Sequence, residues 1–469
     1  MAELELMEKS QLSEPRQEAN QTVRLKIDAT EGSSSIRIGF TDQRLTAYGG
    51  MAVWSHFLRQ KSFRSVLRSH IPHQPTSPNA YDPTDTALGF LGGILSGANK
   101  LSRVAWLRSD EAISEVLGIE AVPSESSLSR FFNVFDQQTS EHLAKLHRWA
   151  IDQLPTRPDG YTLDMDSWAL LHEDGHQEGV APGYTRRGIK PCQRPLVATL
   201  AEAQMVAGYR LRPGNTACVN GADEYLKRTI EGLPSHIRLS LVRADSGFSS
   251  AKVLGVVEEL GLHYIMAYPM RSPVQRLCRH QDCEWENTAV EGLQVQEVEM
   301  EEVGRRLIVI RQRIKSRPDC GGKALLEVPG YKFQALITNL PSSHNPLWIW
   351  RRYNGRADIE NRIKELGDQF GIKGLTCKAF WATEALHHLA ITAYNLCVLL
   401  QRRLGQQAHC QLQTLRWRLF NRAAIWSRAQ GKPHLRLSVH GEEERRFWSE
   451  VLTKITAPPN CNAVASLSA

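Results

Sequence analysis

Hydrophobic and polar residues along this chain follow three different spacings, one after another. Between residues 49 and 154 apolar residues recur at helical spacing, as in Ala112–Leu117, which predicts a series of helices. From 160 to 270 short apolar runs of strand length alternate with helical stretches, which predicts a mixed α/β sheet. From 271 to 345 strand-like runs are broken by Gly and Pro, which predicts a β-rich segment.

Individual elements can be assigned within this pattern. The strands expected in the α/β region are Tyr161–Asp166, Pro195–Leu200, Val206–Leu211, Ile237–Arg243 and His263–Tyr268. The helices expected between them are Ala222–Leu233 and Ser250–Leu260. The β-rich segment should contain strands at 294–299, 307–314 and 333–338. Two short strands are expected near the start of the chain, at 23–28 and 36–40, and an apolar helix packed under the sheet is expected at 382–404.

The stretch 353–366 reads as the start of a helix. Its apolar residues form one stripe at helical spacing, made by Ile359, Ile363, Leu366 and, just beyond, Phe370. Gly355 can bend the chain into this helix, and Glu360 and Lys364 share one face of it. A carboxylate held on a rigid helix beside Arg356 and Lys364 can hold a divalent cation near a phosphate. The alternative is a solvated helix that carries salt bridges.

Two acidic motifs lie upstream of this helix. The first is Leu163-Asp164-Met165-Asp166-Ser167 and the second is Arg243-Ala244-Asp245-Ser246-Gly247-Phe248. Asp164 and Asp166 point to one face of a strand, and Asp245 follows the next predicted strand, so Asp166 and Asp245 can occupy neighbouring positions. Glu360 can then be brought to them by its helix. For any single aspartate the alternative is a helix-capping or turn residue.

Three carboxylates in one pocket repel one another and need divalent cations to coexist. Two hard ions roughly 3.5–4 Å apart can clamp the attacking and leaving oxygens of an in-line phosphoryl transfer. Oxygen ligands favour Mg²⁺, and Mn²⁺ is expected to substitute for it. The trio therefore predicts a site for two Mg²⁺ ions.

Together the three motifs resemble the catalytic core of DDE transposases of bacterial insertion sequences. The helix matches the Tyr-x2-Arg-x3-Glu motif of that clan through Tyr353, Arg356 and Glu360. The two acidic motifs look most like the group numbered thirteen-eighty, and the resemblance spans roughly residues 45 to 440 in the right order. The chain departs from the pattern at two positions: the Lys usual seven residues after the Glu is Gly367, and Trp168 stands where a small hydroxyl residue is common.

The resemblance implies an RNase H-like α/β core with Asp166, Asp245 and Glu360 as catalytic residues and metal ligands. Asp166 is preferred to Asp164 as the first ligand because it lies nearer the strand end and directly before a small polar residue. The residues expected to support the site are Asp164, Tyr353, Arg356 and Lys364.

The resemblance also divides the chain into regions. These are a polar N-terminal segment (1–45), a helical DNA-binding and dimerisation domain (46–155), the first part of the core (156–270), a β-rich insertion (271–345), the second part of the core (346–405) and a basic C-terminal region (406–469).

Basic and polar residues in three of these regions are candidates for DNA contacts. Ser127 and Arg130 face outward on a predicted helix capped by Ser124, although this could be a plain bundle helix. The basic stretches 305–317 and 402–428, the second interleaved with aromatic residues, suit a phosphate backbone, but each could equally face water or pack as an ordinary surface. The arginines singled out in them are Arg311, Arg313, Arg416, Arg418 and Arg422.

Composition adds only modest constraints. Lys plus Arg exceed Asp plus Glu by 57 − 50 = 7, and this basic excess suits a nucleic-acid partner without requiring one. Residues 1–18 are acidic and unlike a signal peptide, and no apolar run is long enough to span a membrane, so a cytoplasmic protein that associates with the bacterial nucleoid is expected. The spacing of Cys278, His280 and Cys283, with Cys320 later, fits no standard zinc site.

These observations predict a transposase that binds the terminal inverted repeats of its own element as double-stranded DNA, cleaves there and joins the ends to target DNA. The resemblance implies a homodimer, because two DNA ends must be held at once. One alternative is a domesticated RNase H-like nuclease that depends on metal. The other is a DNA-binding protein without catalysis, against which the carboxylate trio argues.

Overall fold

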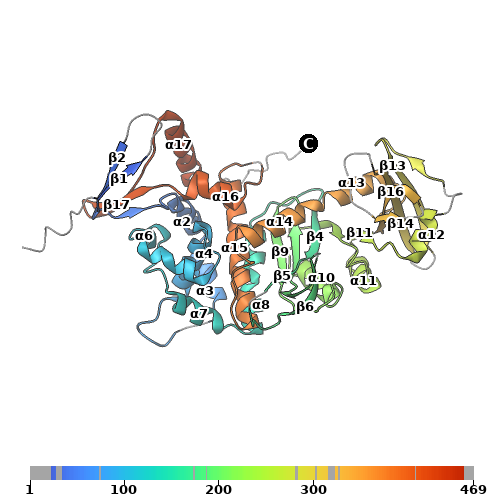
Figure 1. Cartoon of the computed structure of the whole chain (residues 1–469), viewed down its shortest axis with the longest axis horizontal. Coiled ribbons are helices and arrows are strands. Elements are labelled where there is room, and N and C mark those ends of the chain that lie inside the picture. The colour runs from blue at the N-terminus through green and yellow to red at the C-terminus, as the bar shows by residue number, and fades with distance from the viewer. Residues whose placement is uncertain are drawn as a thin grey trace, which may run out of the picture.

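The protein is elongated, with helices at one end, a large mixed sheet in the middle and a β-rich part at the other end (Figure 1). The computed structural model describes residues 23–27, 34–72, 75–172, 175–185, 187–279, 284–300, 304–314, 323–325, 328–406 and 408–458. Candidate residues Lys315, Arg317, His280, Cys283 and Cys320 lie outside the described residues. Within the described part, no helix is long and apolar enough to cross a membrane.

The helical pattern predicted for residues 49–154 is confirmed. The helices are α2 (Met51–Gln60), α3 (Phe63–His70), α4 (Pro83–Ser96), α5 (Leu101–Ala105), α6 (Ile113–Leu117), α7 (Glu125–Asn133), α8 (Gln137–Leu143) and α9 (Lys145–Ile151). The predicted cap is also present, since the Ser124 side chain accepts a hydrogen bond from the Ser127 backbone N at 3.2 Å. That these helices form a separate domain stays a prediction.

The α/β class is confirmed by a single large sheet of mixed direction. Its core strands are β4 (Tyr161–Ser167), β8 (Leu196–Leu200), β9 (Met205–Arg210), β10 (Leu239–Ala244) and β11 (His263–Tyr268). They lie in the order β11-β10-β4-β8-β9, with β4, β9, β10 and β11 running in one direction and β8 in the other. The helices α10 (Ala222–Glu231) and α11 (Ala251–Glu259) lie within the predicted ranges.

The β-rich segment extends this same sheet. It contains β12 (Glu286–Asn287), β13 (Leu293–Met300), β14 (Arg305–Arg313), β15 (Lys323–Leu325) and β16 (Val328–Thr338), so the predicted strands are present. β16 pairs antiparallel with β11, and β14 pairs with β16, so hydrogen bonds run without a break from the core into the segment. An unpredicted helix, α12 (Ser272–Arg279), precedes these strands.

The apolar helix predicted at 382–404 is α15 (Phe380–Arg403), and it stands between the helical region and the sheet (Figure 1). It contacts α4, α7, α8 and α9 on one side and β9 on the other. Several of its polar side chains form hydrogen bonds across the seam between these two sides. Asn395 exchanges two hydrogen bonds of 2.9 Å with the Val206 backbone, and the Glu384 carboxylate accepts from Leu211 N at 2.9 Å and from Ser140 Oγ at 3.1 Å.

The C-terminal region contains both helices and strands. It contains α16 (Leu412–Leu415), a π-helical turn (Arg416–Phe420), the strands β17 (Ala424–Ala429) and β18 (Lys432–Leu437), and α17 (Glu442–Thr456). β17 pairs with β3 (Leu45–Thr46), so two segments far apart in the chain meet in one small sheet. The sequence pattern did not predict these strands, because β17 and β18 are short and contain a single buried residue, with little apolar alternation.

The buried carboxyl of Glu384 leads to a prediction about stability. Burial raises its pKa from 4.5 to about 7, so the folded protein keeps a proton that the unfolded chain has released between these pH values. Stability contributed by this proton is complete below about pH 4.5 and is lost as the pH rises to about 7. Glu384→Gln can accept from Leu211 N through its amide oxygen and donate its amide N–H to Ser140 Oγ, and it has no charge to bury, so it should be more stable than the wild type by about 3 kcal/mol above pH 7.

Thermal unfolding at a series of pH values, with both proteins side by side, measures this difference. His147 and His388 are also buried beside α15 and have lowered pKa values. Both proteins contain them, so their effect on stability cancels in the difference between the two proteins. A difference between the two melting temperatures that stays constant from pH 4 to 8 would contradict the expected proton uptake.

Candidate active site

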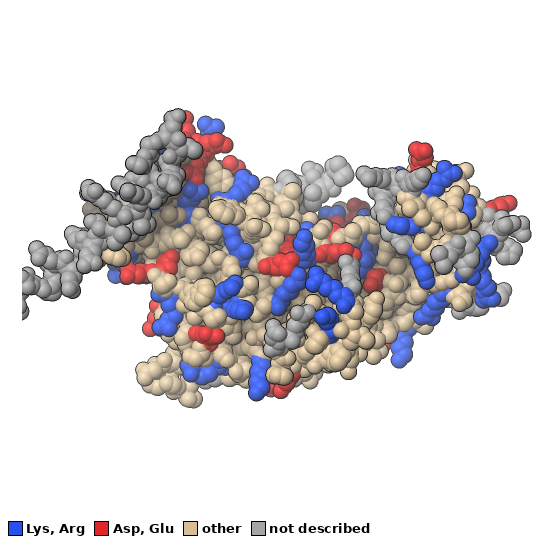
Figure 2. Space-filling view, viewed as in Figure 1, with Lys and Arg blue, Asp and Glu red and all other residues tan. Residues whose placement is uncertain are grey.

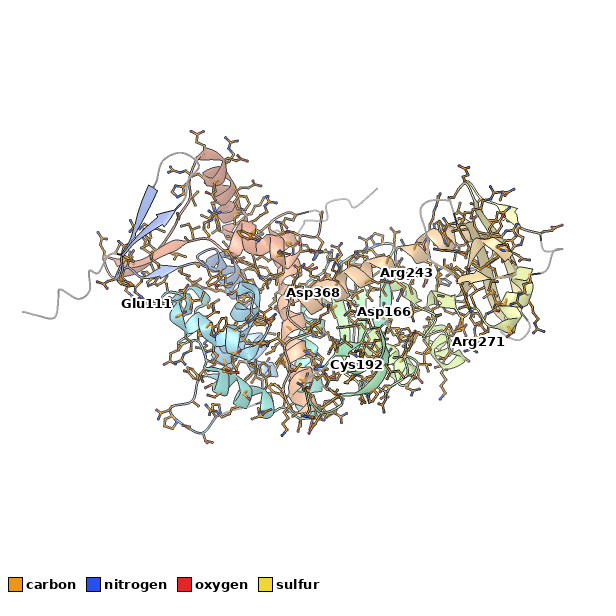
Figure 3. The ribbon with its side chains drawn as sticks, in the orientation of Figure 1. Glu111, Asp166, Cys192, Arg243, Arg271 and Asp368 are labelled. Carbon is orange, nitrogen blue, oxygen red and sulfur yellow. The ribbon has the colours of Figure 1, made fainter. Side chains whose placement is uncertain are left out.

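Two parallel strands and one helix bring the three predicted carboxylates together. β4 carries Asp164 and Asp166, and β10 places Arg243 opposite Asp164, so Asp245 follows beside the end of β4. The helix α14 (Ala357–Asp368) carries Glu360 on its exposed side. Figure 3 labels Asp166 and Arg243 in this part of the core, close to α14. In the space-filling view, acidic and basic side chains lie side by side over the middle of the molecule (Figure 2).

The Asp166 carboxylate is the most constrained of the three. The residue as a whole is 8 % exposed, and its Oδ1 accepts a hydrogen bond of 2.7 Å from Ser167 N. Its Oδ2 accepts a hydrogen bond of 2.7 Å from Arg356 Nη2, which makes a buried ion pair. Burial raises the pKa of Asp166 to about 6, and the negative charges of Asp245 and Glu360 add to this rise while Arg356 opposes it. The three carboxylates are therefore electrostatic neighbours.

Asp164 is fully engaged with one arginine. Arg243 Nε donates to Asp164 Oδ1 at 2.6 Å and Arg243 Nη2 donates to Oδ2 at 2.7 Å, and both side chains are buried. Both carboxylate oxygens of Asp164 thus have a cationic donor, as in a bidentate arginine–carboxylate pair. This arrangement favours Asp164 as an orienting group and leaves Asp166 as the better candidate ligand.

The same arginine explains Gly355. Arg243 Nη1 donates to the Arg352 carbonyl near the end of α13 (Pro346–Asn354), and a Cβ added to Gly355 would lie 2.7 Å from Arg243 Nη1. The chain does turn at Gly355, between α13 and α14, but the turn does not use the backbone freedom that is special to glycine. The Gly355 φ of −56° is open to any residue. Glycine leaves room for the guanidinium to pack directly on the backbone.

Tyr353 and Arg356 belong to two different helices. The predicted single helix is interrupted, since α13 ends at Asn354 and α14 begins at Ala357. Tyr353 is buried at the end of α13, and Arg356 is buried at the N-cap of α14, where it reaches Asp166. The break lets both residues face the carboxylates.

α14 carries two glutamates with different surroundings. Glu360 is exposed beside the aspartates, whereas Glu365 is buried on another side of the helix. Glu365 accepts hydrogen bonds from His409 Nε2 at 2.7 Å and from Leu412 N at 2.9 Å. Glu365 therefore fastens α14 to the C-terminal region, and this fixes the side on which Glu360 is presented.

The two departures from the family pattern have local explanations. At Gly367 an added Cβ would lie 2.9 Å from Lys373 Cε, so the Lys373 side chain crosses the place where a side chain at 367 would stand. Lys373 Nζ then pairs with Asp368 at 2.6 Å. Lys364 lies exposed on the same helix. Trp168 packs against Tyr209, with 6.1 Å between the ring centroids.

The arginines predicted to bind DNA fall into two groups. Arg311 lies between two aromatic rings, 4.2 Å from the Trp285 centroid and 4.9 Å from that of Tyr331. Arg416 donates to the carbonyls of Ile94, Leu95 and Gln369, and Arg422 pairs with Glu444. These contacts hold the protein together. Arg130, Arg313 and Arg418 are exposed, and Ser127 is half-buried beside Arg130.

The oxygen-only donor set fits a hard divalent cation. Among the residues that the structure describes, however, no group of three or more His, Cys, Asp or Glu side chains is arranged to hold an ion as it stands. The charge nearest to Asp166 is the guanidinium of Arg356. Binding of a cation by Asp166, Asp245 and Glu360 would therefore require these side chains to close in.

Comparison with known proteins identifies the family. The family model described as Transposase DDE domain group 1 matches residues 28–458, and the chain belongs to this family. The resemblance to DDE transposases is thus confirmed, while the closer assignment to the group numbered thirteen-eighty stays a prediction. No match was found among curated proteins.

Among solved structures, the piggyBac transposase synaptic complex with hairpin DNA is similar at 11 % identity and a TM-score of 0.41, covering 80 % of this chain and 81 % of that one. The Mos1 transposase paired-end complex is similar at 13 % identity and a TM-score of 0.17, over 41 % and 60 % of the two chains. The Mos1 strand transfer complex gives 13 % identity and a TM-score of 0.16, over 41 % and 59 %. Scores this low do not establish a shared fold.

The packing of Arg243 on Gly355 can be tested with Gly355→Ala. The new methyl group would collide with the guanidinium, so the free energy of unfolding should fall by about 1–3 kcal/mol. Gly255, in α11, is a matched control because a Cβ there meets nothing within 4 Å. Gly255→Ala should be neutral or slightly stabilising. Chemical denaturation of both variants measures the difference, and equal unfolding free energies would contradict the close approach.

Proposed function

We propose that this protein is a transposase that cleaves DNA at the ends of its own element and joins those ends to target DNA. One observation carries the proposal. Asp166 comes from β4, Asp245 follows the end of β10 and Glu360 comes from α14, and the negative charges of Asp245 and Glu360 raise the pKa of Asp166. Membership of the DDE transposase family supports it. The strand order around β4, with β4, β9, β10 and β11 running in one direction and β8 in the other, supports an RNase H-like core.

In this proposal Asp166, Asp245 and Glu360 hold two Mg²⁺ ions, and Mn²⁺ can replace them. When bound, the ions would stabilise the attacking and leaving oxygens of a displacement at phosphorus. Arg356 supplies a buried positive charge beside Asp166 and can bind a phosphate oxygen through its planar fork. Asp164 acts through Arg243, which holds the turn between α13 and α14 and so sets the position of Arg356.

The substrates follow from the proposed reaction. Water attacks the phosphate at the element end first, and the freed 3′-hydroxyl then attacks the target phosphate. Double-stranded DNA with terminal inverted repeats is the proposed partner, and two ends held together call for a homodimer. A plain nuclease on the same core would stop after the first step. A DNA-binding protein without catalysis would not need the acidic trio.

Substitution of the two aspartates of β4 tests the assignment of roles. Asp166→Asn should abolish cleavage of DNA carrying the element ends, and excess EDTA should do the same to the wild type. Asp164→Asn should slow cleavage by a smaller factor, on the order of 10–100, because it acts through Arg243.

The two variants should also differ in stability. The Asp164 side chain is 1 % exposed and that of Asp166 is 12 % exposed, so losing the charge at 164 leaves a more deeply buried arginine without its partner. Denaturation should show a loss of about 3–5 kcal/mol for Asp164→Asn and a smaller loss for Asp166→Asn. If Asp166→Asn cleaved at a near-normal rate while Asp164→Asn was stable but inactive, Asp164 and not Asp166 would be the metal ligand.

The division of the arginines into exposed and internal groups predicts different effects on DNA binding. Arg130→Gln and Arg418→Gln should each lower the slope of log K against log salt by about 0.9, if each neutralises one phosphate. Arg416→Gln should leave the slope unchanged and lower the melting temperature instead, because Arg416 caps carbonyls inside the protein. Binding titrations over a range of salt concentrations measure this, and an unchanged slope in both surface variants would remove them from the DNA interface.

A further inference from the structure

A short hairpin that the sequence pattern did not predict lies beside the catalytic edge. It consists of β6 (Ala181–Thr185) and β7 (Gly188–Gln193), which form a three-stranded sheet with β5 (Leu170–Leu171). Tyr184 and Ile189 are direct partners across the two strands, so their side chains lie on one face. Tyr184 is 76 % exposed and Ile189 is 73 % exposed. A large apolar pair is therefore presented to solvent at the tip of the hairpin.

The charge of this hairpin has one sign. Residues 181–193 include Arg186, Arg187 and Lys190 and contain no Asp or Glu. Arg187 is exposed next to the turn. An exposed ring and an aliphatic side chain, flanked by positive charge, match a polyanion that also offers flat apolar faces. Nucleic acid has both properties, because its phosphates are anionic and its bases stack.

The base of the hairpin packs directly against the backbone around Gly214. A Cβ added to Gly183 would lie 2.3 Å from the Gly214 carbonyl oxygen, and one added to Gly214 would lie 2.0 Å from the Cys192 carbonyl oxygen. The two backbones therefore touch with no side chain between them. Arg194 donates to the Tyr184 carbonyl, and Arg212 Nε donates to the Arg194 carbonyl at 3.1 Å.

The base of the hairpin is joined to the candidate catalytic aspartates through Cys218. Arg194 Nη1 lies 3.8 Å from Cys218 Sγ, and Ser167 Oγ lies 3.3 Å from the same sulfur. Ser167 also binds Asp166, as described above. On the other side, a Cβ at Gly247 would lie 3.1 Å from Cys218 Cβ, which places Cys218 against the turn that follows Asp245. Figure 3 labels Cys192, on β7, and Asp166 in the same part of the core.

We propose that the β6–β7 hairpin is a DNA wedge, in which Tyr184 and Ile189 pack against unstacked bases next to the phosphate held at the carboxylates. Arg187 contacts a flanking phosphate. Apolar side chains inserted between base steps open the stack, and an aromatic ring recovers part of that cost by stacking on the freed base. This proposal rests on the proposed function, because it assigns the kind of DNA that the same site receives.

The test compares binding of the full-length protein to two DNA probes without divalent metal, so that no cleavage occurs. One probe is a fully paired duplex and the other is the same duplex with a short run of mismatched bases. The wild type should bind the mismatched probe more tightly. Tyr184→Ala combined with Ile189→Ala should lose about tenfold in affinity for that probe, and less for the paired one.

Two controls separate stacking from other effects. Tyr184→Phe keeps the ring and should keep the preference for the mismatched probe. Leu452→Ala removes another exposed apolar side chain, on α17, and should change neither affinity. Equal binding of both probes by the wild type, or an unchanged preference in the double variant, would overturn the wedge.

Cleavage assays with Mg²⁺ keep this result distinct from the proposed function. A wild-type protein that prefers mismatched DNA but never cleaves would disprove catalysis and leave the wedge standing. A protein that cleaves but shows no preference would disprove the wedge alone.

Discussion

The contact between Arg243 and Asp164 is the interaction on which the catalytic edge depends. It joins neighbouring parallel strands, and through the Arg352 carbonyl it also fixes the end of α13. Neither charge could be buried here alone, because an unpaired ion in this interior costs several kcal/mol. The pair therefore sets the distance between β10 and the turn from which α14 starts. The proposed ligands sit on either side of this fixed point, and Glu365 holds the far end of the same helix.

Much of this arrangement could be predicted from the sequence, because it depends on local patterns. The strands β4, β10 and β11, the helix α15 and the order of the three carboxylates follow from apolar spacing and from motifs a few residues long. The contact of Arg243 with Gly355 could not be predicted, since it joins residues far apart in the chain and glycine carries no sign of what packs on it. Spacing likewise cannot tell an arginine that caps carbonyls, such as Arg416, from an exposed one such as Arg418.

The continuous sheet changes how the β-rich segment is understood. Because β16 pairs with β11 and β11 pairs with β10, only one strand separates the segment from the strand that leads to Asp245. A movement of the segment on a partner would be transmitted through backbone hydrogen bonds, which deform little. Arg311, held between Trp285 and Tyr331, adds stiffness at the outer end. The segment is therefore better described as an extension of the core than as an appended module.

The small sheet of β3, β17 and β18 has a consequence for the synthesis of the protein. β3 lies near the start of the helical region, and its partner β17 emerges from the ribosome only after the core and the β-rich segment. Pairing across so long a stretch of chain is slow to form, because the loop must close before the contact is gained. The helical region therefore lacks the β3–β17 pairing until the C-terminal part of the chain is available. Truncated chains that end before β17 would leave the backbone of Leu45 and Thr46 without its pairing partner.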